Sequence, residues 1–403
     1  MRNSTKILFT PVILSIMAMA ASCSNPQPNT AGAAAISIKW KKLGELPGSA
    51  DTSQQPAQAH PGLAGPVAGI TGNFLVIGGG SNFQNGLPWQ GGVKTYYDNL
   101  YIYSLHQQAN GDSAMLTSIP ARLPYTVGYP ACISTDKGIL VAGGENKQGP
   151  INKVCLITMP GSKDSLMIHA LPDLPEACSG AMVTALGNKI YLAGGNNTAG
   201  TTSTQLLSLD LTDTTKGWQK LPDLPQPIGF GVLYADPDHQ TLYLASGRKA
   251  NPHARTTFFS SLFAFSVSTR SWHKKADLPY SVSAATGVRF QHKLLLFGGD
   301  QGETFHKTED LLIKIADAKD SVERQAFIEE KNNLQQHHPG FTHQVLAYDI
   351  DQDRWDLAGK LPFASQVTTT AIAWGNKVII PCGEIRAGVR SPDIIEAMIE
   401  PDK

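Results

Sequence analysis

Apolar and polar positions alternate along most of this chain in short runs, and the runs recur in a fixed order. Two runs of β-branched and aromatic residues follow a Leu-Pro pair, as in 181–186 and 190–193, which flank a Gly187-Asn188 turn. Apolar runs broken by Gly-Asn predict a β-hairpin. The Leu-Pro pairs are Leu46-Pro47, Leu123-Pro124, Leu174-Pro175, Leu224-Pro225, Leu278-Pro279 and Leu361-Pro362. A repeat of about 50 residues predicts a ring or stack of similar units.

Each unit contains four expected strands. In four copies a tryptophan stands seven positions before the proline, so the strand before each Leu-Pro pair belongs to the repeat. A third run, such as 205–209, follows the glycines that end the second strand. These ends are Gly78-Gly79, Gly143-Gly144, Gly194-Gly195, Ser246-Gly247, Gly298-Gly299 and Cys382-Gly383. Glycine pairs and tryptophans in four-stranded units are the kelch pattern, so the expected fold is all-β, a six-bladed kelch-type β-propeller.

Both ends of the repeat array are incomplete. Trp40 has no strands of its own blade before it, and the last copy has no tryptophan strand after it. We therefore expect Ser37 to Leu43 to pair with the strand near 393–399, which would close the ring and protect its edges. The expected domain is a single propeller over 36–403.

The fifth copy carries an insertion at about 303–342. Residues 310–315 and 322–334 have helical spacing, which predicts a helical lid or partner surface. His337, His338 and His343 lie close together in this segment, but their spacing matches no metal-site pattern. We interpret them as loop or solvated histidines, and we expect no metal.

The N-terminus predicts export. Arg2 and Lys6 precede an apolar stretch at 7–21, so residues 1–22 are expected to be a signal peptide. The junction before Cys23 resembles a bacterial lipobox, which makes Cys23 the expected lipid-attachment residue and 23–35 a flexible tether. The expected location is the periplasm or the outer membrane of a bacterium, as a lipoprotein. An ordinary signal peptide cleaved nearby is the alternative.

Charge and cysteine content limit the partners. Lys plus Arg and Asp plus Glu both number 33, which gives a formal net charge of zero. Nucleic acid is therefore an unfavourable partner, and the membrane is expected only through the lipid anchor. Four cysteines, Cys132, Cys155, Cys178 and Cys382, show no pairing by spacing, and we expect free buried thiols.

Two segments carry candidate chemistry. In the last copy, Glu384, Arg386 and Arg390 follow the end of an inner strand, where they would project at the channel mouth. A carboxylate beside fixed cations is a candidate acid or base, and arginine binds carboxylates in bidentate fashion. In the first copy, a loop at 81–92 contains Gln84 and Asn85, which suit hydrogen bonds to sugar hydroxyls. A surface ion pair and a loop that only packs over its blade are the alternatives.

At these positions the chain resembles the N-acetylneuraminate epimerase (sialic acid mutarotase) family, whose Gly-Glu-x-x-x-Gly-x-Arg segment is matched by Glu384, Gly388 and Arg390. The segment comes last here, so the chain resembles a cyclically permuted branch. The resemblance implies interconversion of the α and β anomers of N-acetylneuraminate without a cofactor. It implies that Glu384 and Arg390 are catalytic, and that Arg386, Gln84 and Asn85 bind the acidic sugar.

Two other classes of β-propeller enzyme require sequence features that this chain does not show. The repeated Ser-x-Asp-x-Gly-x-Thr-Trp boxes of hydrolytic sialidases are absent from the sequence. The scattered histidines do not suggest the ligand set of a copper oxidase of kelch type. A non-catalytic kelch propeller that binds glycan or protein through the same loops is the remaining alternative.

Overall fold

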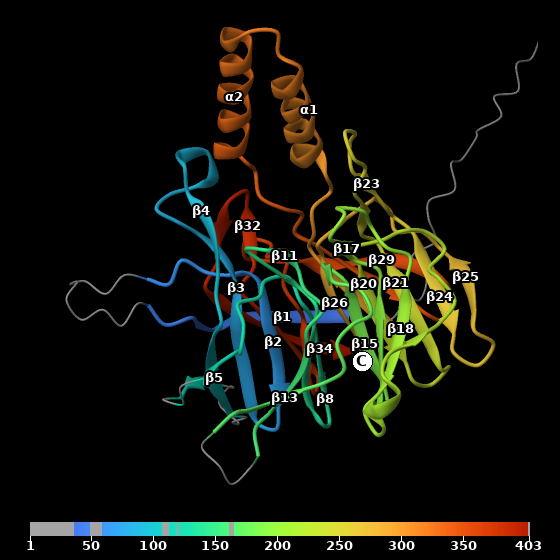
Figure 1. Cartoon of the computed structure of the whole chain (residues 1–403). Coiled ribbons are helices and arrows are strands. Elements are labelled where there is room, and N and C mark those ends of the chain that lie inside the picture. The colour runs from blue at the N-terminus through green and yellow to red at the C-terminus, as the bar shows by residue number, and fades with distance from the viewer. Residues whose placement is uncertain are drawn as a thin grey trace, which may run out of the picture. The chain divides into compact units, whose positions relative to one another are not determined.

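The computed structural model describes residues 36–48, 59–106, 113–117, 119, 121–160 and 165–401. The expected signal peptide, the tether and Cys23 lie outside these residues. The residues from Ile36 onward form a compact unit that is almost entirely β-structure (Figure 1). No helix among the described residues has the length and apolar composition to cross a membrane.

Six antiparallel sheets form the blades of a propeller; five have four strands, and the first has the same four strands and two short additional ones. The innermost strands are β2 (Ala64–Thr71), β8 (Ala131–Thr135), β15 (Met182–Leu186), β20 (Val232–Asp236), β26 (Thr286–Phe290) and β30 (Ile372–Trp374). The second strands are β3 (Phe74–Gln84), β9 (Gly138–Ala142), β16 (Lys189–Ala193), β21 (Thr241–Ala245), β27 (Lys293–Phe297) and β31 (Lys377–Pro381). The third strands are β5 (Asn99–His106), β12 (Val154–Thr158), β18 (Leu206–Asp210), β24 (Leu262–Ser266), β28 (Gln344–Asp349) and β34 (Asp393–Pro401). The outer strands are β6 (Ser113–Leu116), β13 (Met167–Ala170), β19 (Gln219–Lys220), β25 (Ser271–Lys275), β29 (Arg354–Lys360) and β1 (Ile36–Glu45).

Short strands and helical turns supplement the blades. They are β4 (Val93–Tyr96), β7 (Ala121–Arg122), β10 (Glu145–Asn146), β11 (Gly149–Pro150), β14 (Cys178–Ser179), β17 (Asn196–Asn197), β22 (Arg248–Lys249), β23 (Thr257–Phe258), β32 (Glu384–Arg386), β33 (Val389–Arg390) and the 3-10 turns η1 (Pro88–Gln90) and η2 (Thr214–Lys216). The predicted insertion contains α1 (Glu303–Asp317) and α2 (Ser321–Gln336). Figure 1 shows both helices standing beyond β11, β17, β23 and β32, on the side that carries these short strands.

Strand β1 completes the last blade, as the sequence predicts. It pairs antiparallel with β34 from Ile36 opposite Pro401 to Glu45 opposite Asp393. Both ends of the described unit therefore contribute strands to one sheet, and its edge is covered.

A closed ring of main-chain hydrogen bonds joins the starts of the innermost strands. Each N–H donates to the equivalent carbonyl of the preceding blade, over distances between 2.7 and 3.1 Å. All six residues have φ between 53° and 63°. We name these residues the channel ring: Gly65, Tyr129, Gly180, Phe230, Ala284 and Thr368. The bond from Gly65 to Thr368 joins the first inner strand to the last, so the ring has six members and no gap.

The blades pack through apolar faces. Val76 and Leu100 of the first blade share a buried cluster with Ile139 and Val141 of the second, and similar clusters lie between the other blades. Full burial of one such side chain contributes about 1.5–3 kcal/mol. The tryptophans also join blades, because the Trp218 indole N–H donates to the carbonyl of Pro172 in the preceding blade at 2.9 Å. The four cysteines described are free and buried.

The glycine pairs approach neighbouring backbone closely. A Cβ on Gly194, where φ is +60°, would lie 1.9 Å from the carbonyl oxygen of Ile228 in the next blade. In the first blade, the Gly80 N–H donates to Val127, as the Gly144 N–H donates to Cys178. The equivalent pair is therefore Gly79-Gly80, and the sequence assignment of Gly78-Gly79 was wrong by one residue because three glycines occur in a row.

Candidate functional site

One residue of each blade reaches the channel mouth directly after the glycine pair. Each pairs with the residue directly before the channel-ring residue of its own blade, so the six positions are equivalent. We name them the mouth positions: Ser81, Glu145, Asn196, Arg248, Asp300 and Glu384. All six side chains are polar or charged, which makes this end of the channel the candidate site.

The last blade places Glu384 at its mouth position. Main-chain hydrogen bonds to Val367 in both directions fix its backbone, at 2.8 and 2.9 Å. Its Oε1 accepts the Gly388 N–H at 2.9 Å, so the turn between β32 and β33 orients the carboxylate. The side chain is 20% exposed, and the Arg390 Nη1 lies 3.6 Å from Oε1. Glu384 is thus held in one orientation while it remains accessible.

The Arg390 guanidinium is buried beside Glu384. Only 3% of its side chain is exposed, and its Cζ lies 4.6 Å from the centroid of the Phe83 ring. Within the described part of the chain, its Nε and Nη1 have no hydrogen-bond partner. A buried polar group without a partner is unfavourable by about 1–3 kcal/mol, so these donors are suited to receive an acceptor from a ligand.

The other sequence candidates lie around this pair. Gln84 and Asn85 are exposed at the tip of the β3–β4 hairpin, and Arg386 is exposed in β32. The hairpin does reach the last blade, because a Cβ on Gly388 would lie 2.8 Å from Pro88. The structure therefore brings together Glu384, Arg390 and the first-copy loop. It shows no direct contact of Gln84, Asn85 or Arg386 with Glu384 among the described residues.

His338 also belongs to this mouth, although the sequence pattern suggested a loop histidine. It follows α2 and is half-buried, and its Nδ1 accepts the Gly340 N–H at 3.0 Å. Burial lowers the pKa of His338, and the carboxylates of Asp300 and Glu384 oppose that change. An imidazole whose Nδ1 accepts a hydrogen bond carries its proton on Nε2 when it is neutral. The sequence could not reveal this position, since it depends on how α2 folds back.

In the first and second blades, the charged and polar side chains at the mouth pair with one another. Lys94 Nζ lies 2.8 Å from Glu145 Oε1 and 4.4 Å from the centroid of the Tyr129 ring. The Tyr96 hydroxyl donates to the same carboxylate oxygen at 2.6 Å. Burial alone would raise the pKa of Glu145, but Lys94 and Tyr96 lower it. Because these charges are paired, we expect a ligand to bind the polar groups of the fourth to sixth blades.

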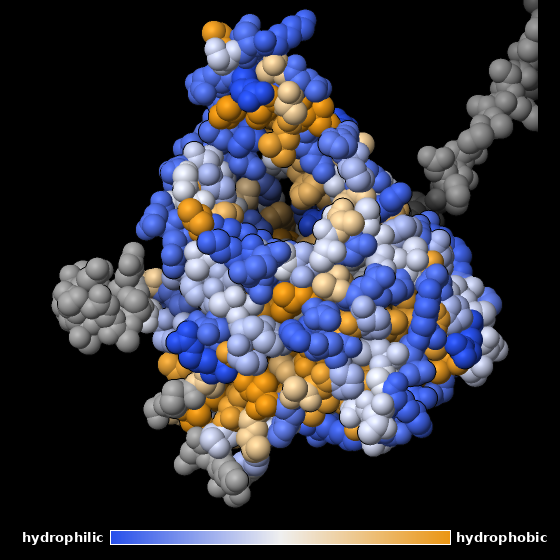
Figure 2. All heavy atoms as spheres, in the orientation of Figure 1, coloured by the Kyte–Doolittle hydropathy of each residue, from blue (hydrophilic) through white to orange (hydrophobic). Residues whose placement is uncertain are grey.

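Below the channel ring, the inner strands enclose a cavity of about 360 Å³. Tyr129, Phe230 and Thr368 line it, whereas Glu384 and Arg390 do not. The carboxylate and the guanidinium at the mouth therefore lie outside this cavity. Figure 2 shows the surface hollowed between the helical pair and the blades, which is where a ligand could reach the mouth.

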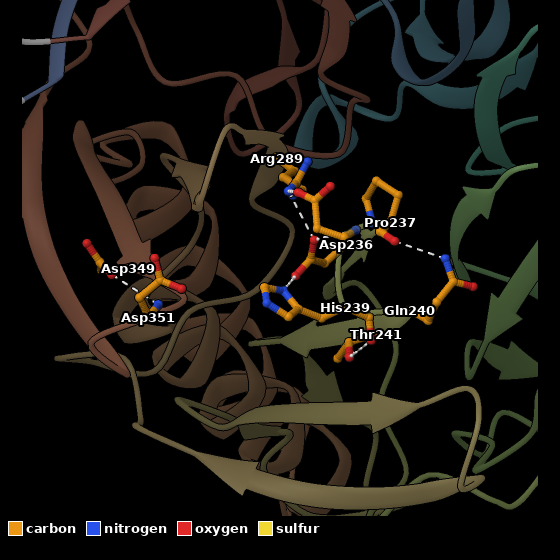
Figure 3. A network of polar contacts seen from close by, with 9 residues as sticks. Asp236, Pro237, His239, Gln240, Thr241, Arg289, Asp349 and Asp351 are labelled. Atoms are coloured by element: carbon orange, nitrogen blue, oxygen red, sulfur yellow. Dashed lines mark hydrogen bonds and ion pairs between the residues drawn. The ribbon is translucent and has the colours of Figure 1, made fainter.

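At the far end of the inner strands, Asp236 ties two blades together (Figure 3). Its fully buried carboxylate lies 3.0 Å from Arg289 of the next blade and accepts a hydrogen bond from His239 Nδ1 at 2.6 Å. The hydrogen bond to Asp236 raises the pKa of His239. Arg289 Nε has no hydrogen-bond partner among the described residues, but the guanidinium is paired with both Asp236 and Asp238, so we assign the network a structural role.

Metal ligands do not gather at either end. No three His, Cys, Asp or Glu side chains of the described residues lie close enough to hold a metal ion together.

The fold and the mouth define the class of the protein, a kelch-type β-propeller with a carboxylate and a buried guanidinium at one end of its channel. A family model described as N-acetylneuraminate epimerase matches residues 171–403, which is more than half of the chain. The chain belongs to this family.

Relatives agree with that assignment at low identity. The chain is 26% identical over 238 residues to the N-acetylneuraminate epimerase of Salmonella typhi, and 24% identical over 226 residues to that of Brucella melitensis. These matches cover 58% and 55% of this chain. They span only 59% and 57% of the two relatives. A solved structure described as "Structure of YjhT" has a TM-score of 0.57 at 16% identity, over 83% of this chain and 94% of that one. The permuted order of the blades stays a prediction.

Proposed function

We propose that this protein interconverts the α and β anomers of N-acetylneuraminate or a related acidic sugar. The observation that carries the proposal is the position of Arg390, whose buried Nε and Nη1 have no hydrogen-bond partner among the described residues and lie beside the accessible carboxylate of Glu384. A carboxylate that can accept a proton and a cation that can bind an anion are the two functions this reaction needs. The family's name supports the substrate class.

The proposed chemistry is an acid–base ring opening. Glu384 takes the proton of the anomeric hydroxyl, the bond from the anomeric carbon to the ring oxygen breaks, and the protonated Glu384 gives that proton to the ring oxygen. The resulting ketone rotates so that its other face meets the ring hydroxyl, Glu384 takes the proton of that hydroxyl, the ring closes, and Glu384 returns the proton to the new anomeric oxygen. Arg390 stabilises negative charge next to the anomeric carbon. Every bond that breaks is re-formed, so no external reactant is consumed.

The test is the rate of anomer exchange, followed by NMR on freshly released α-N-acetylneuraminate. Glu384→Gln keeps the shape of the side chain but removes the base, so exchange should fall to the spontaneous rate while the melting temperature stays near that of the wild type. Glu400→Gln is the matched control, because that carboxylate lies on the surface in an ion pair with Lys39. Wild-type rates in Glu384→Gln would disprove the mechanism. Sugar binding without any acceleration by the wild type would instead indicate a non-catalytic propeller.

We also propose, from the sequence alone, that the protein is exported and anchored through a lipid on Cys23. Labelling with radioactive palmitate tests this, since the label should disappear in Cys23→Ser.

A further inference from the structure

Arg248 occupies the mouth position of the fourth blade, equivalent to that of Glu384 in the sixth. Its main chain is fixed by hydrogen bonds to Gly229 in both directions, each 2.9 Å long, and by pairing of β22 with β23. Arg248 is therefore presented to the channel mouth by the same backbone geometry as the proposed base.

Two aromatic rings clamp the Arg248 guanidinium. Its Cζ lies 4.2 Å from the centroid of Phe230 in the channel ring and 5.0 Å from the centroid of Phe305 in α1. Stacking on aromatic faces holds the guanidinium plane and leaves its N–H edge as the direction for hydrogen bonds. The clamp thus orients the edge without using any of its donors.

The insertion is attached firmly enough to supply the second ring. The Phe305 ring packs against Phe258 with centroids 5.5 Å apart, and Glu309 accepts hydrogen bonds from the Thr256 N–H and hydroxyl at 3.0 and 2.6 Å. Gly302 begins α1 with φ of +87°, and a Cβ there would lie 2.6 Å from the Phe258 ring. Helix α1 is therefore fixed on the β22–β23 hairpin, next to Arg248.

The Arg248 guanidinium lacks a counter-ion in direct contact. Among the described residues, its side chain makes no hydrogen bond or ion pair. Burial lowers the pKa of Arg248, and the carboxylates of Asp300 and Glu384 partly oppose this effect. Arginine nevertheless stays charged in proteins. An oriented, half-buried cation without an ion-pair partner among the described residues, at the same channel mouth as Glu384, is a site for an anionic group of a ligand.

We infer that Arg248 binds the carboxylate of the acidic sugar and thereby makes the site specific for acidic over neutral sugars. This inference rests on the proposed function. It leaves Arg390, 3.6 Å from Glu384, to stabilise charge at the reacting carbon. It also gives the helical insertion a defined role, since Phe305 holds the guanidinium that selects the substrate.

Equilibrium binding tests the inference without any turnover. The probes are 2-deoxy-2,3-didehydro-N-acetylneuraminate, which has the carboxylate but no anomeric hydroxyl, and its methyl ester, which lacks the charge. The wild type should bind the acid about 10–100-fold more tightly than the ester, as expected for hydrogen bonds to a charged group. Arg248→Gln should bind both alike. Arg248→Lys should lose about tenfold for the acid, because it keeps the charge but not the bidentate edge.

A matched control and a stability readout separate binding from a structural role. Arg324→Gln removes an exposed guanidinium from α2 and should retain the wild-type preference for the acid. Phe305→Leu keeps Arg248 but removes one ring, and should weaken binding of the acid alone. The melting temperature of Arg248→Gln should fall only slightly, since its side chain makes no hydrogen bond to described residues and loses only two aromatic contacts.

The outcomes distinguish this inference from the proposed function. An Arg248→Gln variant that keeps the wild-type ratio of acid to ester affinity overturns the inference, even if the wild type accelerates anomer exchange. A wild type that binds neither probe overturns it as well. Loss of the ratio in Arg248→Gln supports it, and that result stands even if the wild type proves unable to accelerate the exchange.

Discussion

The main-chain N–H of Gly65 donates to the carbonyl of Thr368 at 2.7 Å, and this bond joins the first inner strand of the propeller to the last. The two residues are 303 positions apart in the sequence, yet they occupy neighbouring places in the channel ring. The ring closes at one residue pair, so local changes there should affect the whole fold.

Gly65→Ala should destabilise the protein by about 3 kcal/mol or more, because φ is unfavourable and the new Cβ has no space. That Cβ would lie 2.4 Å from the Tyr129 nitrogen, and φ is +59°. Gly72→Ala is the control: φ is +57°, but no atom lies within 4 Å of the Cβ position. It should cost about 1 kcal/mol. Urea unfolding measures both, and equal losses would argue against the close contact.

Arg390→Met should lower kcat/KM for anomer exchange by about 100–1000-fold, as the loss of one preorganised donor does in other enzymes. The variant should still fold with little loss of stability, because Glu384, which loses its ion-pair partner, is 20% exposed and can be solvated. The change also removes a buried guanidinium with two nitrogen atoms that lack a hydrogen-bond partner among the described residues. Arg122→Met, which breaks an exposed ion pair with Asp98, should leave the rate unchanged. A large loss of stability with normal activity in Arg390→Met would show that Arg390 has a structural role and no catalytic one.

His60 should make the protein less stable as the pH falls from about 6.5 towards 4. Burial lowers its pKa from 6.5 to about 4. Over this interval the unfolded chain therefore binds a proton that the folded protein does not, which favours unfolding. His60→Asn retains an acceptor for the Gly62 N–H, which His60 Nδ1 binds at 2.9 Å. Its unfolding free energy should depend less on pH in this range, whereas His106→Gln, on the surface, should follow the wild type.

The fold could be predicted from the sequence because the same residue signals repeat in every blade. Leu-Pro pairs, glycine ends and tryptophans mark each blade, and the unmatched Trp40 strand revealed its pairing with the C-terminal strand. The helical insertion was also visible, since its spacing of apolar positions departs from the alternation of the strands. Each of these features can be recognised from residues that are close in the sequence, so predicting them does not require the folded structure.

The site was predicted only in part. Glu384 and Arg390 were predicted as candidates from their position after an inner strand and from the resemblance, and the structure places their side chains together. Arg248 and Asp300 were missed, although each also follows a glycine directly, as Glu384 does. Comparing that position across all six copies would have found them. The approach of Phe305 and His338 could not be inferred, because it depends on how the helical pair folds over the blades.

The helical pair interrupts one blade between β27 and β28 and contacts the mouth of another. Residues 302–342 can therefore be exchanged as a cassette without changing the inner strands that position Glu384. Transplanting this segment between related propellers would replace the Phe305 ring that holds Arg248 while leaving Arg248, Glu384 and Arg390 in place. On the proposed function, the strength of substrate selection would then change through one insertion while the blade that carries Glu384 stays constant.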